Sequence, residues 1–468
     1  MRQRFVTFAV LGLVLALLAE WNLRSRAISP LDKLNQFWLE FCIGNSGNKL
    51  SDPAVTVIRI NDDYEPLSIG PDSPSAADGK LSRLDFATIL GFVGKLNPKS
   101  VAFLPTPSFD ESLTLNQTDI VPLKDAAMQL PRLVVASSVS DDGEQAKESS
   151  PLTYEALEVE GDVSTLLPFT RTIRRPDPQI LANGDPAFKA IESARNLTSE
   201  EATKIPLVGN FRGKAAASIV LLAVANHAGI AADQIKVNLT AAKPHIQLGD
   251  AKQIPIALDG TFTLPRHGGI TPGMKTMRAG EDGEPVEDYQ FATLRVDEIA
   301  YTGEKEDEVA KRIVETLQGK FDSLQDNLVL IGFDRLADRR IPNGAGPPLS
   351  ETMMVAHAVA TIQSGRFIDW WPTWVRWVAI LIIGLIGFIL LRFSRGKFIP
   401  LWLLTFLLFF AACVVIFRST LTWTPPFFAF ALFGLMLLIG VFVSGGNQVA
   451  AAKQATEEPE AAESEPAE

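Results

Sequence analysis

Residues 398–417, FIPLWLLTFLLFFAACVVIF, decide the class of this protein. They carry no charge over a length close to the ~20 residues with which a helix crosses ~30 Å of hydrocarbon. Residues 374–391, charged only at Arg376, and residues 425–443 have the same character. Core helices of water-soluble proteins rarely stay uncharged for so long. The pattern therefore predicts three transmembrane helices within residues 370–444.

The eight tryptophans mark the same part of the chain. Tryptophan favours the bilayer interface because its ring is apolar whereas its N–H group needs a polar partner. No tryptophan falls between residues 39 and 369, which we assign to a separate domain at residues 27–369. Their positions are Trp21, Trp38, Trp370, Trp371, Trp374, Trp377, Trp402 and Trp423.

A further apolar run, residues 5–19, follows Arg2 and Arg4. A basic start and a short apolar run are typical of a signal peptide. Because no convincing small-x-small cleavage site follows, we predict an uncleaved transmembrane anchor at residues 1–26. A cleaved signal peptide is the alternative.

The short loops predict the orientation, because cytoplasmic loops are enriched in Lys and Arg. The loop between the second and third segments carries Arg392, Arg395 and Lys397, whereas the next loop carries only Arg418. The first of these loops is therefore expected in the cytoplasm, together with both termini. The acidic residues 445–468 are expected to form a disordered cytoplasmic tail, with a docking site for a basic partner as the alternative. This predicts a multi-pass protein of the inner (plasma) membrane with a periplasmic or extracellular domain.

Apolar β-branched runs alternate with helical patterns through the separate domain. Strand–helix–strand order with continuous apolar strands favours an α/β fold with a partly parallel mixed sheet and flanking helices. Polar stretches at residues 138–151 and 278–288 are expected to be surface loops or insertions. We expect strands at 55–60, 100–104, 132–137 and 327–332, helices at 84–96 and 351–364, and an Ala-rich amphipathic helix at 215–229.

Composition argues against several classes of function. The net charge of −11 and the lack of a basic stripe argue against a nucleic-acid partner. The four histidines include no two at ligand spacing, so no metal site is expected. No phosphate-binding Gly-x-x-x-x-Gly-Lys loop, Gly-x-Ser-x-Gly elbow or kinase signature is present, and we predict neither a cofactor nor an enzymatic domain.

Charged residues gather after the strand at residues 327–332. The carboxyl ends of strands in open α/β sheets form the usual ligand crevice, and Asp334 is expected to face it. The candidates for binding a small ligand or ion there are Asp334, Asp338, Arg339, Arg340 and His357. The alternative is a structural Asp–Arg pair in a loop and a histidine satisfied within a helix.

Asp62 and Asp63 follow the first predicted strand. Carboxylates there are candidate ligands for a hard cation, which needs several oxygens. Adjacent strand residues point to opposite faces, so a role in helix capping is favoured over a shared ion.

The segment before the closing helices has an ordered set of features. They are a strand ending in Ile331-Gly332, then Asp338, then Pro342, then a helix with His357-Ala358, and the approach Gly365-Arg-Phe367.

With one apolar segment before the domain and three after it, this order resembles the second class of CHASE domains. These are extracytoplasmic sensory modules of bacterial cyclases, kinases and related membrane receptors. Weaker matches are Asp259-Gly260 and Asp62-Asp63. Two family elements differ: a Trp-Pro-x-Arg element appears only as Lys80-Leu-Ser-Arg83, and an Asp-Gly-x-x-Arg-Arg element only as Arg174-Arg175.

The resemblance implies a sensor or binding protein that takes an unknown small ligand, with Arg83 and Asp62 among the candidate binding residues. Lacking an output domain, it would signal through its transmembrane helices to a protein partner in the membrane or envelope. A cell-envelope scaffold built on a degenerate sensory domain is the alternative. An extracytoplasmic enzyme would rest only on Asp334, Asp338 and His357.

Overall fold

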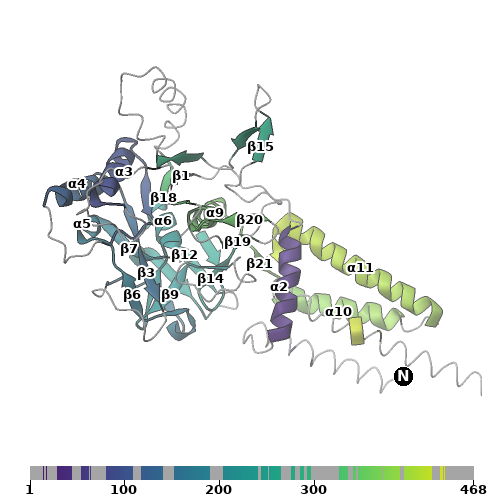
Figure 1. Cartoon of the computed structure of the whole chain (residues 1–468). Helices are drawn as coiled ribbons and strands as arrows, with labels where there is room; N and C mark the ends of the chain where they lie inside the picture. The colour runs from purple at the N-terminus through teal and green to yellow at the C-terminus, as the bar shows by residue number, and fades with distance from the viewer. Residues whose placement is uncertain are drawn as a thin grey trace, which may run out of the picture. The chain divides into compact units, whose positions relative to one another are not determined.

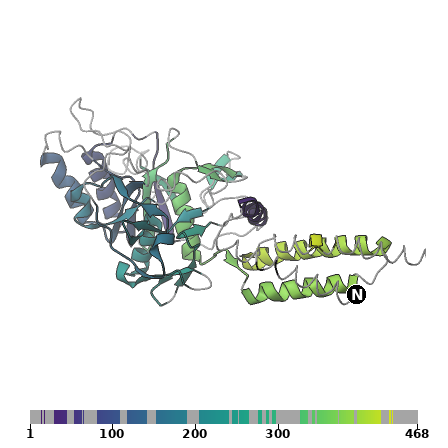
Figure 2. The ribbon, with the colours of Figure 1, turned by 90° about the horizontal axis from the view of Figure 1, so that it is seen from below.

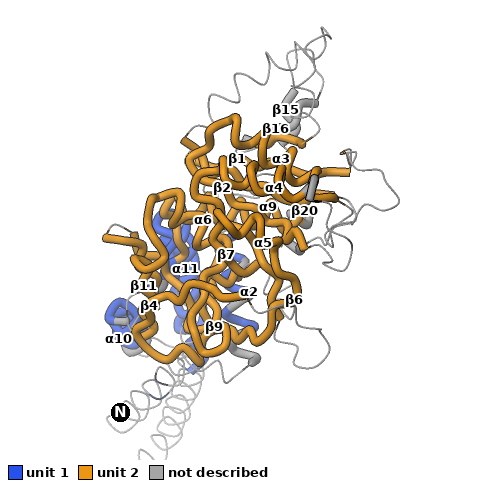
Figure 3. The backbone as a smooth tube through the Cα atoms, turned by 90° about the vertical axis from the view of Figure 1, so that its left-hand side faces the viewer, with its two compact units in different colours: residues 1–46, 369–468 blue, residues 47–368 orange. Residues whose placement is uncertain are grey.

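The computed structural model divides the chain into two compact units (Figure 3). The terminal unit comprises Met1–Ser46 and Asp369–Glu468, and the central unit comprises Gly47–Ile368. The structure describes residues 29–44, 54–62, 64, 81–108, 117–140, 152–189, 204–240, 244–250, 252–264, 276–279, 285–288, 292–296, 326–335, 341–343, 346–371, 373–390, 395–423 and 433–435, with Val14, Leu17 and Leu437.

A mostly parallel sheet forms the centre of the central unit (Figure 1). Its parallel strands lie in the spatial order β17 (Ala292–Arg295), β1 (Val55–Ile60), β18 (Leu328–Phe333), β2 (Ser100–Phe103), β3 (Leu133–Ser140) and β7 (Gly184–Phe188). A further strand, β6 (Arg171–Arg174), pairs antiparallel with the end of β3. The prediction of a mixed, partly parallel α/β sheet is confirmed. β18 lies between β1 and β2 although it follows both of them by more than two hundred residues.

Helices cover both faces of this sheet, and the strand residues alternate between two cores. Val55 and Val57 pack with α6 (Ile219–Ala228) and α9 (Glu351–Ser364) on one face. Ile58 and Ile60 pack on the other face, which is covered by α3 (Arg83–Lys95), α4 (Gln117–Met128) and the short α5 (Pro178–Leu181). Burial on both faces explains why these strands are continuous apolar runs.

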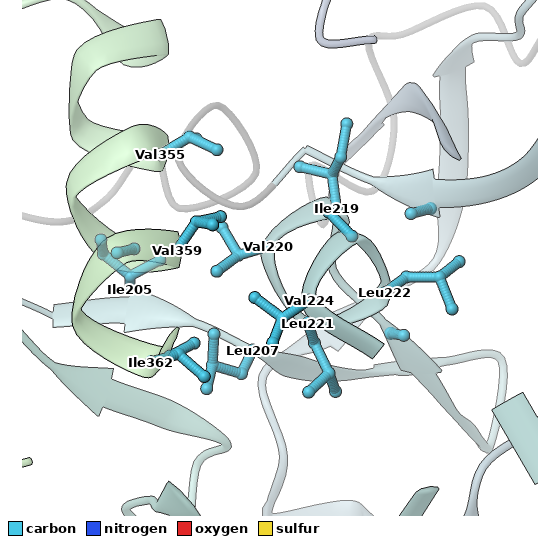
Figure 4. Packing of buried hydrophobic residues seen from close by; sticks show 14 of the residues in the cluster. Ile205, Leu207, Ile219, Val220, Leu221, Leu222, Val224, Val355, Val359 and Ile362 are labelled. Carbon is cyan, nitrogen blue, oxygen red and sulfur yellow. The ribbon is translucent and has the colours of Figure 1, made fainter. Parts of the chain in front are cut away.

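The helix predicted at residues 215–229 begins later than expected and is not amphipathic. Residues 214–217 form β10 (Lys214–Ala217), and the helix α6 starts only after its N-cap Ser218. Every residue of α6 from Ile219 to Asn226 is buried, because the sheet covers one side of the helix and smaller strands cover the other. Figure 4 shows Val220 of α6 facing Val359 of α9, with Leu207 beside Ile362.

Several small sheets complete the central unit. They are β5 (Pro168–Phe169) with β9 (Val208–Phe211) and β10; β4 (Glu158–Glu160), β11 (Ile235–Asn238), β12 (His245–Leu248) and β13 (Lys252–Pro255); β8 (Lys204–Pro206) with β14 (Thr261–Thr263); β15 (Thr276–Ala279) with β16 (Pro285–Asp288); and β19 (Ile341–Asn343) with β20 (Gly346–Leu349). Within the surface loop or insertion predicted at residues 278–288, β15 and β16 pair antiparallel, which hydropathy does not reveal, and residues 280–284 lie outside the described residues. Of the loop predicted at residues 138–151, residues 138–140 extend β3, and 141–151 lie outside the described residues.

The terminal unit contains α2 (Ser29–Gly44), α10 (Thr373–Leu390) and α11 (Arg395–Thr420). Figure 2 shows α10 and α11 running alongside each other. The short strands β21 (Asp369–Trp370) and β22 (Thr422–Trp423) pair, which ties the start of α10 to the end of α11. The two helices are therefore antiparallel. Our sequence boundary placed residues 27–44 with the separate domain, whereas α2 lies in the terminal unit.

One described helical segment, Lys397–Thr420 within α11, is long and apolar enough to cross a membrane. Only 11% of its most apolar window is buried, unlike the core helix of a soluble protein. Trp374–Ile386 within α10 is a shorter apolar helix. Most of the segments predicted at residues 5–19 and 425–443 lies outside the described residues, as does the tail at 445–468.

Candidate functional site at the carboxyl ends of the strands

The helices that follow β1 and β18 in the chain lie on opposite faces of the sheet. The helix after β1 is α3, which covers one face, and the helix after β18 is α9, which covers the other. Neighbouring parallel strands with this arrangement form a topological switch point, where ligands bind in open α/β sheets. The backbone N–H of Asp334 donates to the carbonyl oxygen of Ile60 at 3.0 Å, so the two strand ends lie together. We call the carboxyl ends of these strands the β1/β18 edge.

An ion pair joins the two strands at this edge. Arg59 Nη1 donates to Asp334 Oδ2 at 3.1 Å, and the two side chains are only 16% and 10% exposed. Asp334 therefore lies at the predicted edge and takes part in an Asp–Arg pair. Its partner is Arg59, 275 positions away in sequence, rather than a residue of its own loop. The guanidinium of the next residue, Arg335, lies 4.1 Å from the centre of the Phe333 ring.

The first turn of α9 is attached to the end of β18. Thr352 Oγ1 donates to the carbonyl oxygen of Phe333 at 2.6 Å. A Cβ atom on Gly332 would lie 2.2 Å from Thr352 Oγ1, so this close approach of helix and strand requires a glycine. The N-cap Ser350 accepts from the backbone N–H of Met353, so the helix begins at this edge.

Arg83 takes part in a second ion pair, at the start of α3. Its Nε donates to Asp177 Oδ2 at 3.0 Å, with side-chain exposures of 7% and 6%. Asp177 is the N-cap of α5 and accepts from the backbone N–H of Gln179, while its own N–H donates to the carbonyl oxygen of Pro107. The pair thus holds two helix N-termini and the loop after β2 together. The ligand-binding role that the resemblance implies for Arg83 would require this pair to open or to contact the ligand from its rim.

A buried carboxylate that we did not single out from the sequence, Asp85, lies in the first turn of α3, two residues after Arg83. Asp85 accepts from Ser82 N at 2.7 Å, from Ser82 Oγ at 2.6 Å and from the Tyr64 hydroxyl at 3.0 Å. Burial, and then the charge of Asp85, raise the pKa of Tyr64, so the phenol stays protonated and donates. Ser82 and Asp85 form a capping box, and their Ser-x-x-Asp spacing before an apolar run is the sequence feature from which this role of Asp85 could be predicted.

The structure places the other predicted residues separately. His357 is 1% exposed and lies six residues beyond Glu351, about 9 Å along the axis of α9 from its first turn. Asp62 is exposed in the turn after β1. Asp63, Asp338, Arg339 and Arg340 lie outside the described residues. Among the residues that are described, no group of three or more His, Cys, Asp or Glu side chains is placed to hold a metal ion.

His227, in the last turn of α6, predicts a pH dependence of stability. Burial, with Lys99 and Arg132 nearby, lowers the pKa of His227 from 6.5 to about 4, against the opposing effect of Asp326. Unfolded chains take up a proton near pH 6.5 and folded chains only near pH 4, so stability is full above 6.5 and decreases as the pH falls toward 4. Such a shift corresponds to ~3 kcal/mol, which screening by solvent at a partly exposed ring reduces to on the order of 1–2 kcal/mol.

Chemical unfolding at pH 7.5 and pH 5 measures this dependence. His227→Gln is expected to reduce the loss of stability between the two pH values, and Lys99→Met to reduce it by a smaller amount. An unchanged difference in His227→Gln would contradict the assignment of the acid sensitivity to this ring.

Comparisons with protein-family models, with curated proteins and with solved structures find no match for this chain. The resemblance to CHASE domains and the geometry of the β1/β18 edge are therefore the basis for a functional proposal.

Proposed function

We propose that this chain is a membrane-anchored extracytoplasmic sensor or binding protein with four transmembrane helices and no catalytic role. A small ligand would bind at the β1/β18 edge and bias the transmembrane helices, which act on a protein partner. The observation that carries this proposal is the attachment of α9 to the end of β18 through Thr352 and Phe333. A change at the edge would move the first turn of α9.

The course of the chain supports α9 as the connecting element. The helix ends at Gly365, whose φ of 68° gives a left-handed C-cap, and β21 begins at Asp369. α10 follows at Thr373, so a few residues join a helix that starts at the ligand edge to an apolar helix of the terminal unit. A ligand can shift such a system only through different affinities for two states, and a repositioned α9 would distinguish those states.

Lys252 of β13 fixes the other end of α9, which gives a second prediction. Its Nζ donates to the carbonyl oxygens of Ile362 at 2.7 Å and Gln363 at 3.0 Å, and burial lowers its pKa. Lys252→Met is expected to lower the free energy of unfolding by about 1–2 kcal/mol, because charged hydrogen bonds to the helix end are lost. Hydrogen exchange should increase in the last turn of α9. Lys236→Met is the control, because the Lys236–Glu158 pair is 60% and 63% exposed and should contribute little.

The proposal is tested with the full chain in lipid nanodiscs. Amino acids, sugars and small carboxylates are screened for an increase in Tm, and any binder is then examined by hydrogen exchange. We expect protection at the β1/β18 edge together with altered exchange in residues 351–368, and loss of binding in Arg59→Met but not in Lys236→Met. Protection that stops at the edge, or the absence of any stabilising small molecule or protein, would count against a sensor.

The second candidate is an envelope scaffold that uses a degenerate sensory domain. The observation in its favour is that two candidate binding residues are already bonded internally, Asp334 to Arg59 at the β1/β18 edge and Arg83 to Asp177 next to the loop after β2. Cross-linking in native membranes separates the two functions. A stoichiometric complex that persists regardless of small molecules supports the scaffold, whereas one whose formation changes with a ligand supports the sensor.

A further inference from the structure

Helix α2 of the terminal unit has an exposed apolar face that packs against none of the described cores. Lys33, Phe37 and Phe41 are spaced four residues apart and therefore share one side of the helix. All three are exposed, with Phe37 at 66% and Phe41 at 47%. An aromatic face of this size is rare on the water-exposed surface of a helix.

The rest of α2 packs onto the apolar helices of the terminal unit. The ring of Trp38 meets that of Phe410 of α11 edge-on, with 5.1 Å between the centroids. Phe410 forms a small core with Ile383 of α10 and with Phe433, against which Trp38 packs. Cys42 and Ile43 of α2 are buried. α2 is therefore attached to α11 part of the way along that helix.

The position of the Trp38–Phe410 contact along α11 indicates how deep α2 would lie in a bilayer. Phe410 precedes Arg418, the charged residue near the end of α11, by eight residues, or about 12 Å of helix. Half of a bilayer's hydrocarbon core measures about 15 Å. If α11 spans the membrane, the Trp38–Phe410 contact lies within the leaflet on the side of Arg418, and the neighbouring Phe37 lies at a similar depth.

We propose that α2 is inserted into the outer leaflet of the bilayer, with Phe37 and Phe41 among the acyl chains of phospholipids. Lys33 on the same face would reach toward the phosphates, as long basic side chains do at an interface. The exposed apolar side of α11, including Leu403, Leu404 and Leu407, would meet acyl chains nearer the middle of the same bilayer and beyond it. This inference rests on the part of the proposed function that makes α11 a transmembrane helix.

The test uses the full chain in vesicles of phosphatidylcholine and phosphatidylglycerol. Cys42→Ala and Cys413→Ala provide a background without cysteines. Phe37→Cys, Lys33→Cys and Leu407→Cys are each labelled with the environment-sensitive fluorophore NBD. The quenchers are nitroxide lipids labelled near the headgroup or deep in the chain, and aqueous iodide. Far-UV circular dichroism confirms that each variant is folded.

We expect the label in Phe37→Cys to lose most of its emission to nitroxide lipids and almost none to iodide. The label in Lys33→Cys should be quenched best by the headgroup nitroxide, and that in Leu407→Cys by the deep one. Iodide quenching in Phe37→Cys, with deep quenching retained in Leu407→Cys, would overturn the inference and leave the transmembrane helix intact. Protection of Phe37→Cys from every quencher would overturn it in favour of a covering protein, and cross-linking of this variant to itself would identify a second copy. Iodide quenching in Leu407→Cys would instead overturn the membrane part of the proposed function.

Discussion

Asp177→Asn is expected to lower the free energy of unfolding of the central unit by about 3 kcal/mol, because it removes the carboxylate charge that pairs with the buried Arg83 guanidinium. The substitution keeps the side-chain oxygen that caps α5 and nearly keeps the volume, so the loss reports the charge. Far-UV circular dichroism and hydrogen exchange of β2 and α5 are the measurements to use. Tryptophan fluorescence does not report on this unit, since no tryptophan lies between Trp38 and Trp370.

The double variant Arg83→Met, Asp177→Asn provides the decisive comparison. Removing both charges also removes the cost of burying the guanidinium without the Asp177 charge, and replacing a buried pair by uncharged groups is often neutral. We therefore expect the double variant to recover most of the stability lost in Asp177→Asn. A single variant within about 0.5 kcal/mol of the parent would show that the pair behaves like an exposed one.

The local features of the fold could be predicted from the sequence, because their causes are local. Strand 55–60 and helix 351–364 were predicted within a residue, since both are buried and their apolar patterns are strong. The Ala-rich residues 215–217 misled the prediction because pairing with β9 outweighs their helical propensity. The Ser82–Asp85 capping box is likewise a local feature, because its Ser-x-x-Asp spacing is visible in the sequence.

The contacts that define the candidate site are non-local. Arg59 and Asp334 lie 275 positions apart and Arg83 and Asp177 lie 94 apart, and each pair depends on how strands and helices are ordered in space. The insertion of β18 between β1 and β2 creates the β1/β18 edge, and hydropathy contains no information about that order. The sequence therefore indicates that Asp334 follows a buried strand, but it does not indicate which basic side chain forms an ion pair with it.

Gly332→Ala is expected to lower the stability of the central unit by about 2–4 kcal/mol. The new methyl group would lie 2.2 Å from Thr352 Oγ1 and 2.8 Å from its Cγ2, so the Thr352 side chain, the strand or the helix must shift. Overpacking of this kind costs about 1–3 kcal/mol, and loss of the Thr352–Phe333 hydrogen bond adds about 1 kcal/mol. Gly91→Ala is the matched control. The nearest atom to its Cβ is 3.8 Å away, and alanine is preferred over glycine within α3.

A double-mutant cycle with Thr352→Ala links this clash to the connecting role of α9. Thr352→Ala removes the two closest atoms, so it should rescue part of the Gly332→Ala defect and give a coupling free energy of about 1 kcal/mol or more. In a sensor, Gly332→Ala should also alter hydrogen exchange in residues 351–368 without ligand, because it displaces the first turn of α9. In a scaffold, the same substitution should weaken the fold and leave the envelope complex independent of small molecules. Additive effects of the two substitutions would show that β18 and α9 are not coupled at this contact, and a signal from the β1/β18 edge would then need another route.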